Sequence, residues 1–116
     1  MQKTGNPYQN SEVRTLLKAF LTLENEEECL SFLQDLMTIK EIQDMSQRLR
    51  VAQLLEEGKA YQQISENVSV SSATISRVSR ALNYGEGGYV TVLERLRACR
   101  VAQRFLQILI FVSPRI

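Results

Sequence analysis

The sequence predicts an all-α protein of about six helices, and three observations support this prediction. Glycine and proline are scarce, at 5 and 2 of the 116 residues, which leaves few breaks of the kind that separate short strands. Apolar residues recur at intervals of three and four positions, which is the spacing of an amphipathic helix. Polar residues that can cap helices precede several of these stretches, and no stretch has a persuasive strand pattern.

The length and the N-terminus favour a single domain. A chain of 116 residues can bury one modest core. Residues 1–10 are polar and lack the apolar centre of a signal peptide, so we expect a flexible N-terminus there. No run of about 20 apolar residues is present, so we expect no membrane partner. Cys29 and Cys99 are far apart in sequence, which favours reduced thiols in a cytoplasmic protein.

The composition argues against an enzyme. Histidine is absent, which removes the most common general base and the most common zinc ligand. Two isolated cysteines are too few for a thiolate zinc site, and no glycine-rich phosphate loop follows a strand pattern. We therefore expect no catalytic residue, no metal and no cofactor.

The first three helices are expected at about 11–23, 26–36 and 38–57. Each has apolar residues on one face. The first two are short helices, which need a surface against which to bury that face. The three apolar stripes are formed by Val13, Leu16, Leu17, Phe20 and Leu21, by Cys29, Phe32, Leu33 and Leu36, and by Ile42, Met45, Leu49 and Ala52.

Capping residues mark where these helices begin or end. Asn25 precedes three glutamates, and Glu28 occupies the capping-box position. Thr38 and Glu41 form a second capping-box pattern. Gly58 can adopt the left-handed conformation of the residue that follows a helix.

Two short helices follow at about 60–67 and 71–82, and together they predict a helix-turn-helix over 61–82. Counting from Tyr61, apolar residues fall at positions 4, 8, 10, 15 and 18, where the two helices and their support must touch. Ser69 falls in the turn, where a glycine would more easily adopt a positive φ. The five apolar residues are Ile64, Val68, Val70, Ile75 and Val78.

The other face of the second of these helices is predicted to bind DNA. Small polar side chains near its N-terminus permit close approach to the major groove, and serine can donate or accept at base edges. Arginine can reach guanine or phosphate, and a helix N-terminus favours a phosphate. The alternative is an ordinary helical hairpin with a serine-rich cap. The predicted DNA-binding residues are Ser71, Ser72, Ala73, Thr74, Ser76, Arg77 and Arg80.

Charge is divided unevenly between the two halves of the chain, although the net charge is only +1. Residues 1–66 contain seven Lys and Arg and eleven Asp and Glu, whereas residues 67–116 contain seven and two. A basic second half suits contact with phosphates, although chance can produce such an asymmetry in a small protein.

Residues 97–116 are predicted to form a C-terminal extension that is first basic and then apolar. After a last helix that begins near Tyr89, Arg97, Arg100 and Arg104 recur at helical spacing, and the following residues are almost all apolar. The leading interpretation is a helical extension that packs on the core or on a partner subunit. A basic amphipathic contact with a membrane surface and a poorly ordered end remain open.

Several motifs occur together and in a fixed order. The first set is Thr38-Ile39-Lys40-Glu41, Arg48-Leu49-Arg50-Val51, Leu55-Glu56-Glu57-Gly58 and Ala73-Thr74-Ile75-Ser76-Arg77. The second set includes Glu27-Glu28-Cys29, Ser46-Gln47-Arg48-Leu49 and Leu82-Asn83-Tyr84-Gly85. With the first set, residues 38–82 resemble the Trp-repressor superfamily, and with the second, about residues 10–96 resemble its YerC/YecD-type branch.

The resemblance implies a domain at 11–96 that forms an intertwined homodimer. The first helices would interlock with the partner, and the helix-turn-helix units would stand at the two ends. Such a dimer reads two half-sites on double-stranded DNA about one helical turn apart. The implied function is a sequence-specific transcriptional regulator, with repression as the expected mode. The alternative is an interaction module that retains the fold and contacts only protein.

The resemblance also implies an effector pocket. In the Trp repressor the ligand lies between two arginines, which Arg50 and Arg77 match, and Thr38 matches a contributing threonine. The glycine that gives the indole room is Val78 in this chain, and the serine that holds the ammonium group is Ala81. We therefore predict that tryptophan does not bind, and that the two arginines form surface salt bridges or contact phosphate.

Overall fold

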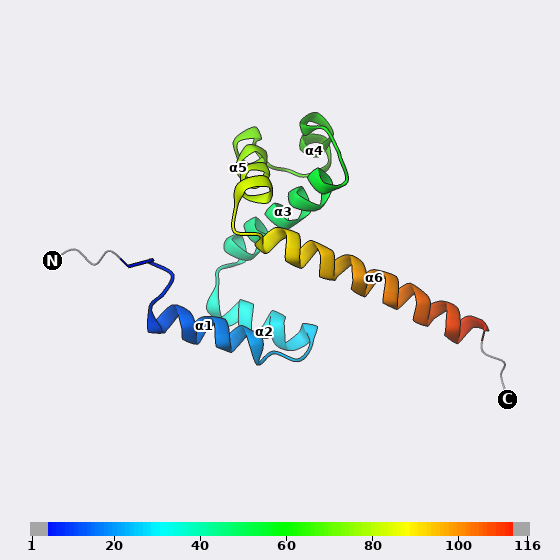
Figure 1. Cartoon of the computed structure of the whole chain (residues 1–116), viewed down its shortest axis with the longest axis horizontal. Coiled ribbons are helices and arrows are strands. Elements are labelled where there is room, and N and C mark those ends of the chain that lie inside the picture. The colour runs from blue at the N-terminus through cyan, green and yellow to red at the C-terminus, as the bar shows by residue number, and fades with distance from the viewer. Residues whose placement is uncertain (1–4, 113–116) are drawn as a thin grey trace. The chain divides into compact units, whose positions relative to one another are not determined.

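The computed structural model describes residues 5–112, which contain six helices and no strand (Figure 1). The predicted all-α fold with about six helices is confirmed. The chain divides into two units, Met1–Ile42 and Gln43–Ile116. In the described range, no helix combines the length and the hydropathy that crossing a membrane requires. The helices are α1 (Ser11–Leu21), α2 (Glu26–Leu36), α3 (Ile39–Glu56), α4 (Tyr61–Asn67), α5 (Ser72–Tyr84) and α6 (Gly88–Val112).

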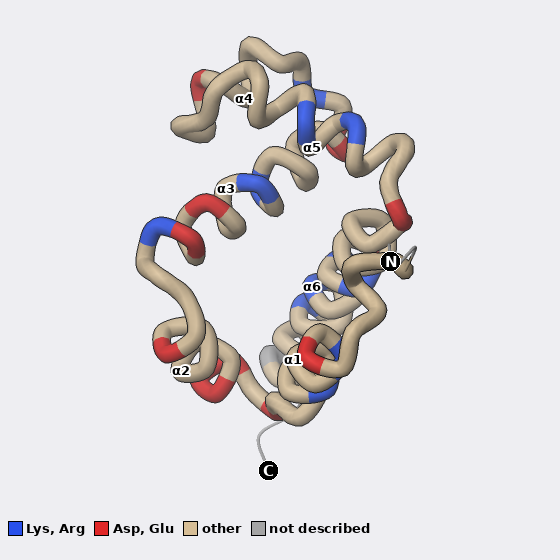
Figure 2. Tube along the Cα trace, turned by 90° about the vertical axis from the view of Figure 1, so that its left-hand side faces the viewer, with Lys and Arg blue, Asp and Glu red and all other residues tan. Residues whose placement is uncertain are grey.

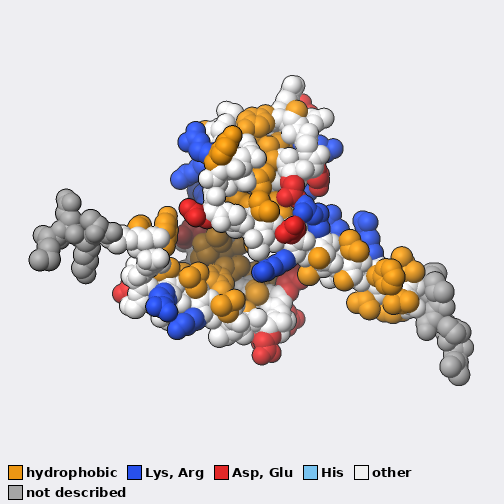
Figure 3. Space-filling view, in the orientation of Figure 1, with side chains coloured by type: hydrophobic (Ala, Val, Ile, Leu, Met, Phe, Trp, Pro, Cys, Tyr) orange, Lys and Arg blue, Asp and Glu red, His pale blue; other side chains and the backbone are white. Residues whose placement is uncertain are grey.

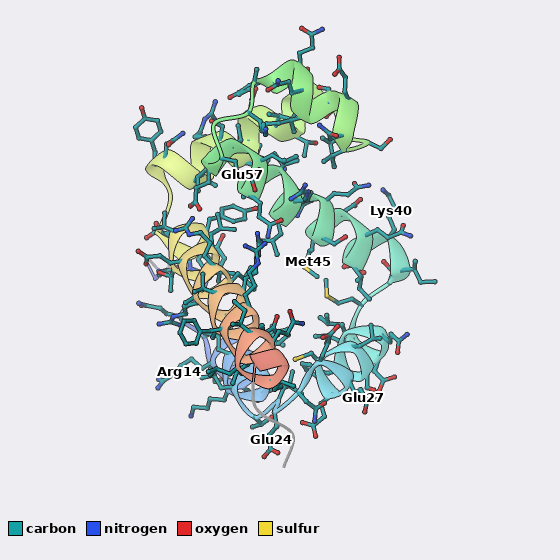
Figure 4. The ribbon with its side chains drawn as sticks, turned by 90° about the vertical axis from the view of Figure 1, so that its right-hand side faces the viewer. Arg14, Glu24, Glu27, Lys40, Met45 and Glu57 are labelled. Atoms are coloured by element: carbon teal, nitrogen blue, oxygen red, sulfur yellow. The ribbon has the colours of Figure 1, made fainter. Side chains whose placement is uncertain are left out.

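Side-chain caps begin α1 and α2. The Asn10 carboxamide accepts from the Val13 amide at 2.8 Å, and the Asn25 carboxamide accepts from the Glu28 amide at 2.9 Å. In a standard capping box the Glu28 carboxylate would accept from the amide of the N-cap residue, Asn25. Here it accepts from the amide of Glu24, one residue earlier. The acidic first turn of α2 faces solvent, as Glu27 does in Figure 4.

The segment before α1 was predicted to be flexible over residues 1–10. Residues 1–4 lie outside the described residues. Between residues 5 and 10 the chain makes a turn in which the Gln9 amide donates to the Asn6 carbonyl at 3.0 Å. Asn10 then belongs to the cap of α1, so order begins before the first helical residue.

The first unit has no core of its own. No residue of α1 or α2 is buried. Phe20 and Phe32 join the two helices edge to face, with ring centroids 5.3 Å apart and an interplanar angle of 75°. The remaining large apolar side chains stay partly or largely exposed, and they include Leu16, Leu17, Leu21, Leu30 and Leu36. Two helices of 11 residues each need more apolar cover than this contact provides.

The predicted capping box at the start of α3 is confirmed. The Thr38 amide donates to the Glu41 carboxylate at 3.0 Å, and the Glu41 amide donates to the Thr38 hydroxyl at 3.1 Å. The hydrogen bonds from the Thr38 backbone and side chain stabilise the charged carboxylate and lower the pKa of Glu41 below its ordinary value.

This cap should make part of the stability depend on pH. A lowered folded-state pKa stabilises the fold above the ordinary carboxyl pKa, and the contribution is lost as pH falls through the lowered value. In urea titrations between pH 3 and pH 7, Glu41→Gln should show a smaller loss of stability at the acid end than the wild type, because Gln caps without titrating. Equal acid losses in both proteins would contradict this role of Glu41.

The second unit contains the hydrophobic core, which α3, α4, α5 and α6 all supply. α4 packs against α5, and α5 packs against α6. Of the stripe that the sequence predicted on α3, Ala52 is buried and Leu49 packs half-buried against the core, whereas Met45 remains 37% exposed. The core lies against the C-terminal part of α3, so it covers the end of the predicted stripe and adds Val51 and Leu54 beside it. The buried residues are Val51, Ala52, Leu54, Ile64, Val68, Ile75, Val78 and Leu93.

Two glycines end helices of this unit for different reasons. Gly58 has φ +83, and the amides of Gly58 and Lys59 donate to carbonyls of the last turn of α3 at 3.0 Å each. Gly85 has a negative φ, but a Cβ there would lie 2.3 Å from the Ala81 carbonyl oxygen. Gly85 therefore permits a close approach of two backbone segments, and α5 continues to Tyr84 rather than ending near Leu82.

The last helix and the predicted extension form one continuous helix, α6, of 25 residues. Leu93 attaches its first half to the core and is 2% exposed. The Arg97 guanidinium forms an ion pair with the Glu56 carboxylate of α3. Residues 113–116 of the predicted extension lie outside the described residues.

Candidate nucleic-acid interface

The five apolar positions predicted to hold the helix-turn-helix all belong to the core. Ile64 of α4 and Ile75 of α5 are fully buried, and Val68 and Val78 are nearly so. Val70 is half-buried and packs against the same cluster. These contacts fix the angle at which α5 packs against α4. The spacing of apolar residues in the sequence predicted contacts at these positions.

The turn between α4 and α5 needs no glycine. Val68 is extended, at φ −127 and ψ 131, and the Val70 amide donates to the Val68 carbonyl at 2.8 Å. This bond closes a three-residue turn centred on Ser69. No non-glycine residue in the described range has a positive φ. Serine therefore fits this turn, because the turn does not use the positive φ that a glycine would adopt more easily.

The start of α5 engages two of the predicted DNA-binding side chains. The Ser71 hydroxyl accepts from the Thr74 amide at 3.2 Å, and the two hydroxyl oxygens lie 3.1 Å apart. Thr74 is also half-buried. Ser71 and Thr74 thus have a structural role as the N-terminal cap of the helix.

The remaining predicted residues share one exposed face of α5. Ser72, Ala73, Ser76, Arg77 and Arg80 are all exposed, and their spacing places them opposite the buried Ile75 and Val78. No acidic residue occurs between Glu66 and Glu86, and Figure 2 shows the basic residues of α5. Within residues 5–110, neither Arg77 nor Arg80 forms an ion pair. The face therefore offers two guanidinium groups and small polar side chains to an anionic ligand.

A hollow of about 270 Å³ lies beside this face and includes Arg77. Arg48 of α3 lines it, whereas the predicted Arg50 does not and instead donates to the Gln53 carboxamide at 3.4 Å. Thr38 lies in the first unit, where it caps α3. The residues that line the hollow are Arg48, Thr74, Arg77, Val78, Ala81 and Tyr89.

The helical period explains why Arg48 takes the place expected for Arg50. Residues two apart on a helix point about 200° away from each other, so only one of these arginines can face α5. Arg48 precedes the buried Val51 and Ala52 by three and four residues, which places it on the side of α3 that faces the core. The spacing between Arg48 and these two apolar residues was the feature of the sequence that could have predicted its position.

Comparison with known proteins identifies relatives over most of the chain. The family model described as Trp repressor protein matches residues 11–97. The uncharacterized protein YerC of Bacillus subtilis (strain 168) is 46% identical over 86 residues, which are 74% of this chain and 83% of YerC.

Two solved structures share the fold. A TrpR-like protein from Eubacterium eligens ATCC 27750 superposes with a TM-score of 0.76 at 44% identity, covering 79% of this chain and 95% of that one. A protein from Staphylococcus aureus, described provisionally as a Trp repressor, gives a TM-score of 0.74 at 44% identity, covering 77% and 89%.

Proposed function

The chain belongs to the Trp repressor family, and on this basis we propose that it is a sequence-specific DNA-binding transcriptional regulator. The observation that carries the proposal is the exposed face of α5, where Ser72, Ala73, Ser76, Arg77 and Arg80 stand opposite a core that holds the helix in place. A rigid helix with small side chains near its N-terminus can enter the major groove. Repression of transcription in the cytoplasm is the expected mode of action.

The proposed contacts divide into two kinds. The N-terminus of α5 carries the partial positive charge of the helix dipole, which favours a DNA phosphate near Ser71 and Ser72. Ala73, Ser76 and Arg77 lie further into the helix, where side chains can reach base edges. Phosphate contacts would position the helix, and base contacts would select the sequence.

We also propose that the protein acts as a homodimer. The first unit supports this proposal because its two helices bury no residue and leave Leu17, Leu21 and Leu30 at least half exposed. A second copy could cover this apolar surface, as the family's intertwined arrangement implies. A twofold dimer would present two copies of α5 to half-sites about one turn of DNA apart.

Selection of bound fragments from random double-stranded DNA, followed by titration of the best fragment at several salt concentrations, tests both proposals. We expect one preferred, palindromic sequence and an affinity that falls steeply as salt rises. Binding without sequence preference or salt dependence would contradict the proposed regulator and favour a helix-turn-helix that contacts protein. A selected sequence without a palindrome would argue against the dimer.

L-tryptophan should give no saturable heat in isothermal titration with this protein. Val78 lines the hollow beside Arg77. By the family resemblance it matches the glycine that admits the indole ring, and a valine there would fill that space. Ala81 offers no oxygen for the ligand's ammonium group. Val78→Gly with Ala81→Ser is the matched test, since it restores both features. Micromolar binding by the wild type would refute the prediction.

A further inference from the structure

The hollow beside α5 brings together two arginines from different helices. Arg48 of α3 and Arg77 of α5 both line it, and both are exposed to solvent. All residues that line the hollow belong to the second unit. Its volume of about 270 Å³ gives room for a group much larger than a water molecule, whose share of liquid volume is about 30 Å³. Figure 3 shows basic side chains gathered beside α5 in the upper part of the view.

No acidic residue lines this hollow. Among the side chains that the structure describes, none forms an ion pair with Arg48 or Arg77. The acids nearest to these arginines in sequence are Asp44 of α3 and Glu86 after α5, and neither belongs to the lining. Two positive charges that share a hollow repel each other, and an anion between them is attracted by both. The hollow is therefore suited to a negatively charged group.

The remaining lining residues favour a phosphate group over a carboxylate or an amino acid. Both oxygens of a carboxylate lie in one plane and are satisfied by a single guanidinium, whereas phosphate oxygens point in tetrahedral directions that donors from two helices can reach. Thr74 and Tyr89 also line the hollow and carry hydroxyl groups. When the Ser71 hydroxyl donates to the Thr74 oxygen, the Thr74 proton is left for an anion. Val78 and Ala81 offer no side-chain acceptor for an ammonium group.

We propose that this hollow binds one phosphate group, held by Arg48 and Arg77 from two helices. Two sources present that group: the backbone of DNA, which passes beside a helix inserted in the major groove, and a free phosphate. The DNA source rests on the proposed function, whereas the free source does not. With DNA bound, Arg77 would contact the backbone and leave Ser76 and Arg80 for base edges. The inference adds Arg48, on α3, to the contact residues predicted on α5.

Titration of the DNA-free protein with inorganic phosphate tests the hollow directly. At constant ionic strength, phosphate should produce saturable shifts in the amide NMR signals of Thr74 and Tyr89, and acetate should not. Arg48→Ala should abolish this saturation. Arg50→Ala is the matched control, because it removes the same charge from the same helix outside the hollow, and it should bind phosphate as the wild type does. Circular dichroism checks that both variants keep their helices.

Binding to the selected DNA tests the backbone as the source. Arg48→Ala should weaken binding about tenfold on every sequence and lower the salt slope by about 1, whereas Arg50→Ala should stay close to the wild type. Single backbone phosphates of the DNA are then replaced by uncharged methylphosphonates. One position should weaken binding by the wild type and by Arg50→Ala without weakening Arg48→Ala further, which couples that phosphate to Arg48.

The two titrations separate the sources, and they separate this inference from the proposed function. Saturable phosphate binding without a coupled methylphosphonate position would assign the hollow to a free phosphate, and the reverse result would assign it to the DNA backbone. If Arg48→Ala matched Arg50→Ala in both titrations while the wild type still selected a DNA sequence, the phosphate site would be refuted and the proposed function would stand. If the wild type bound no DNA, the proposed function would fail, and inorganic phosphate alone would decide whether the site exists.

Discussion

Replacing Ile75 with alanine should lower the free energy of unfolding by about 2–5 kcal/mol. Ile75 is fully buried in the cluster that α3, α4, α5 and α6 share, so the lost methyl groups would leave a cavity where four helices meet. A domain of this size has a total stability of only about 5–15 kcal/mol, so the variant could be substantially unfolded at 37 °C.

Urea denaturation followed by circular dichroism measures this effect. Ser76→Ala is the control, because Ser76 is the next residue of α5 and is exposed, so its stability should change by no more than about 0.5 kcal/mol. A loss below about 1 kcal/mol in Ile75→Ala would mean that the packing around α5 is looser than the burial of this side chain indicates.

Arg77→Ala and Arg80→Ala should each weaken binding to the selected DNA by about 1–3 kcal/mol if the arginine contacts guanine. Both side chains are exposed on the DNA-binding face proposed for α5, so their removal should leave the fold intact. An arginine that contacts phosphate would instead weaken binding to all sequences and reduce the salt slope by about 1. Fluorescence anisotropy at several salt concentrations separates the two roles.

Arg14→Ala provides the matched control for charge. Arg14 is exposed on α1 in the first unit (Figure 4), so its replacement removes one positive charge without touching α5. Its effect on affinity should be small compared with that of Arg77→Ala. If all three variants bound DNA as well as the wild type, α5 would not be the reading helix.

The sequence predicted the helix-turn-helix well because that motif depends on local spacing. Ile64 and Ile75 lie on either side of a short turn, and both are buried. Their spacing in the sequence was enough to predict that both contribute to the contact between the two helices. Helix starts were also predictable where a side chain caps its own helix, as Thr38 does with Glu41. Such features involve residues that are close together in the chain, so they can be predicted from sequence spacing alone.

Features that depend on contacts between distant segments were harder to predict. The buried face of α3 is determined by α4, α5 and α6, so the apolar stripe predicted from the sequence included the exposed Met45 and left out the buried Val51 and Leu54. The side of α3 that faces the core also explains why Arg48 rather than Arg50 lines the hollow. The length of α6 was left open because an apolar run alone does not distinguish a helix from a disordered end.

The three-residue turn around Ser69 also affects the unfolded state of the chain. A glycine at this position would give the unfolded chain many more backbone conformations, all of which folding would have to remove. Because the turn is closed by the bond between Val70 and Val68 with no positive φ, serine fits it without strain. The angle between the two helices is therefore held at a lower cost in conformational entropy than a glycine turn would require.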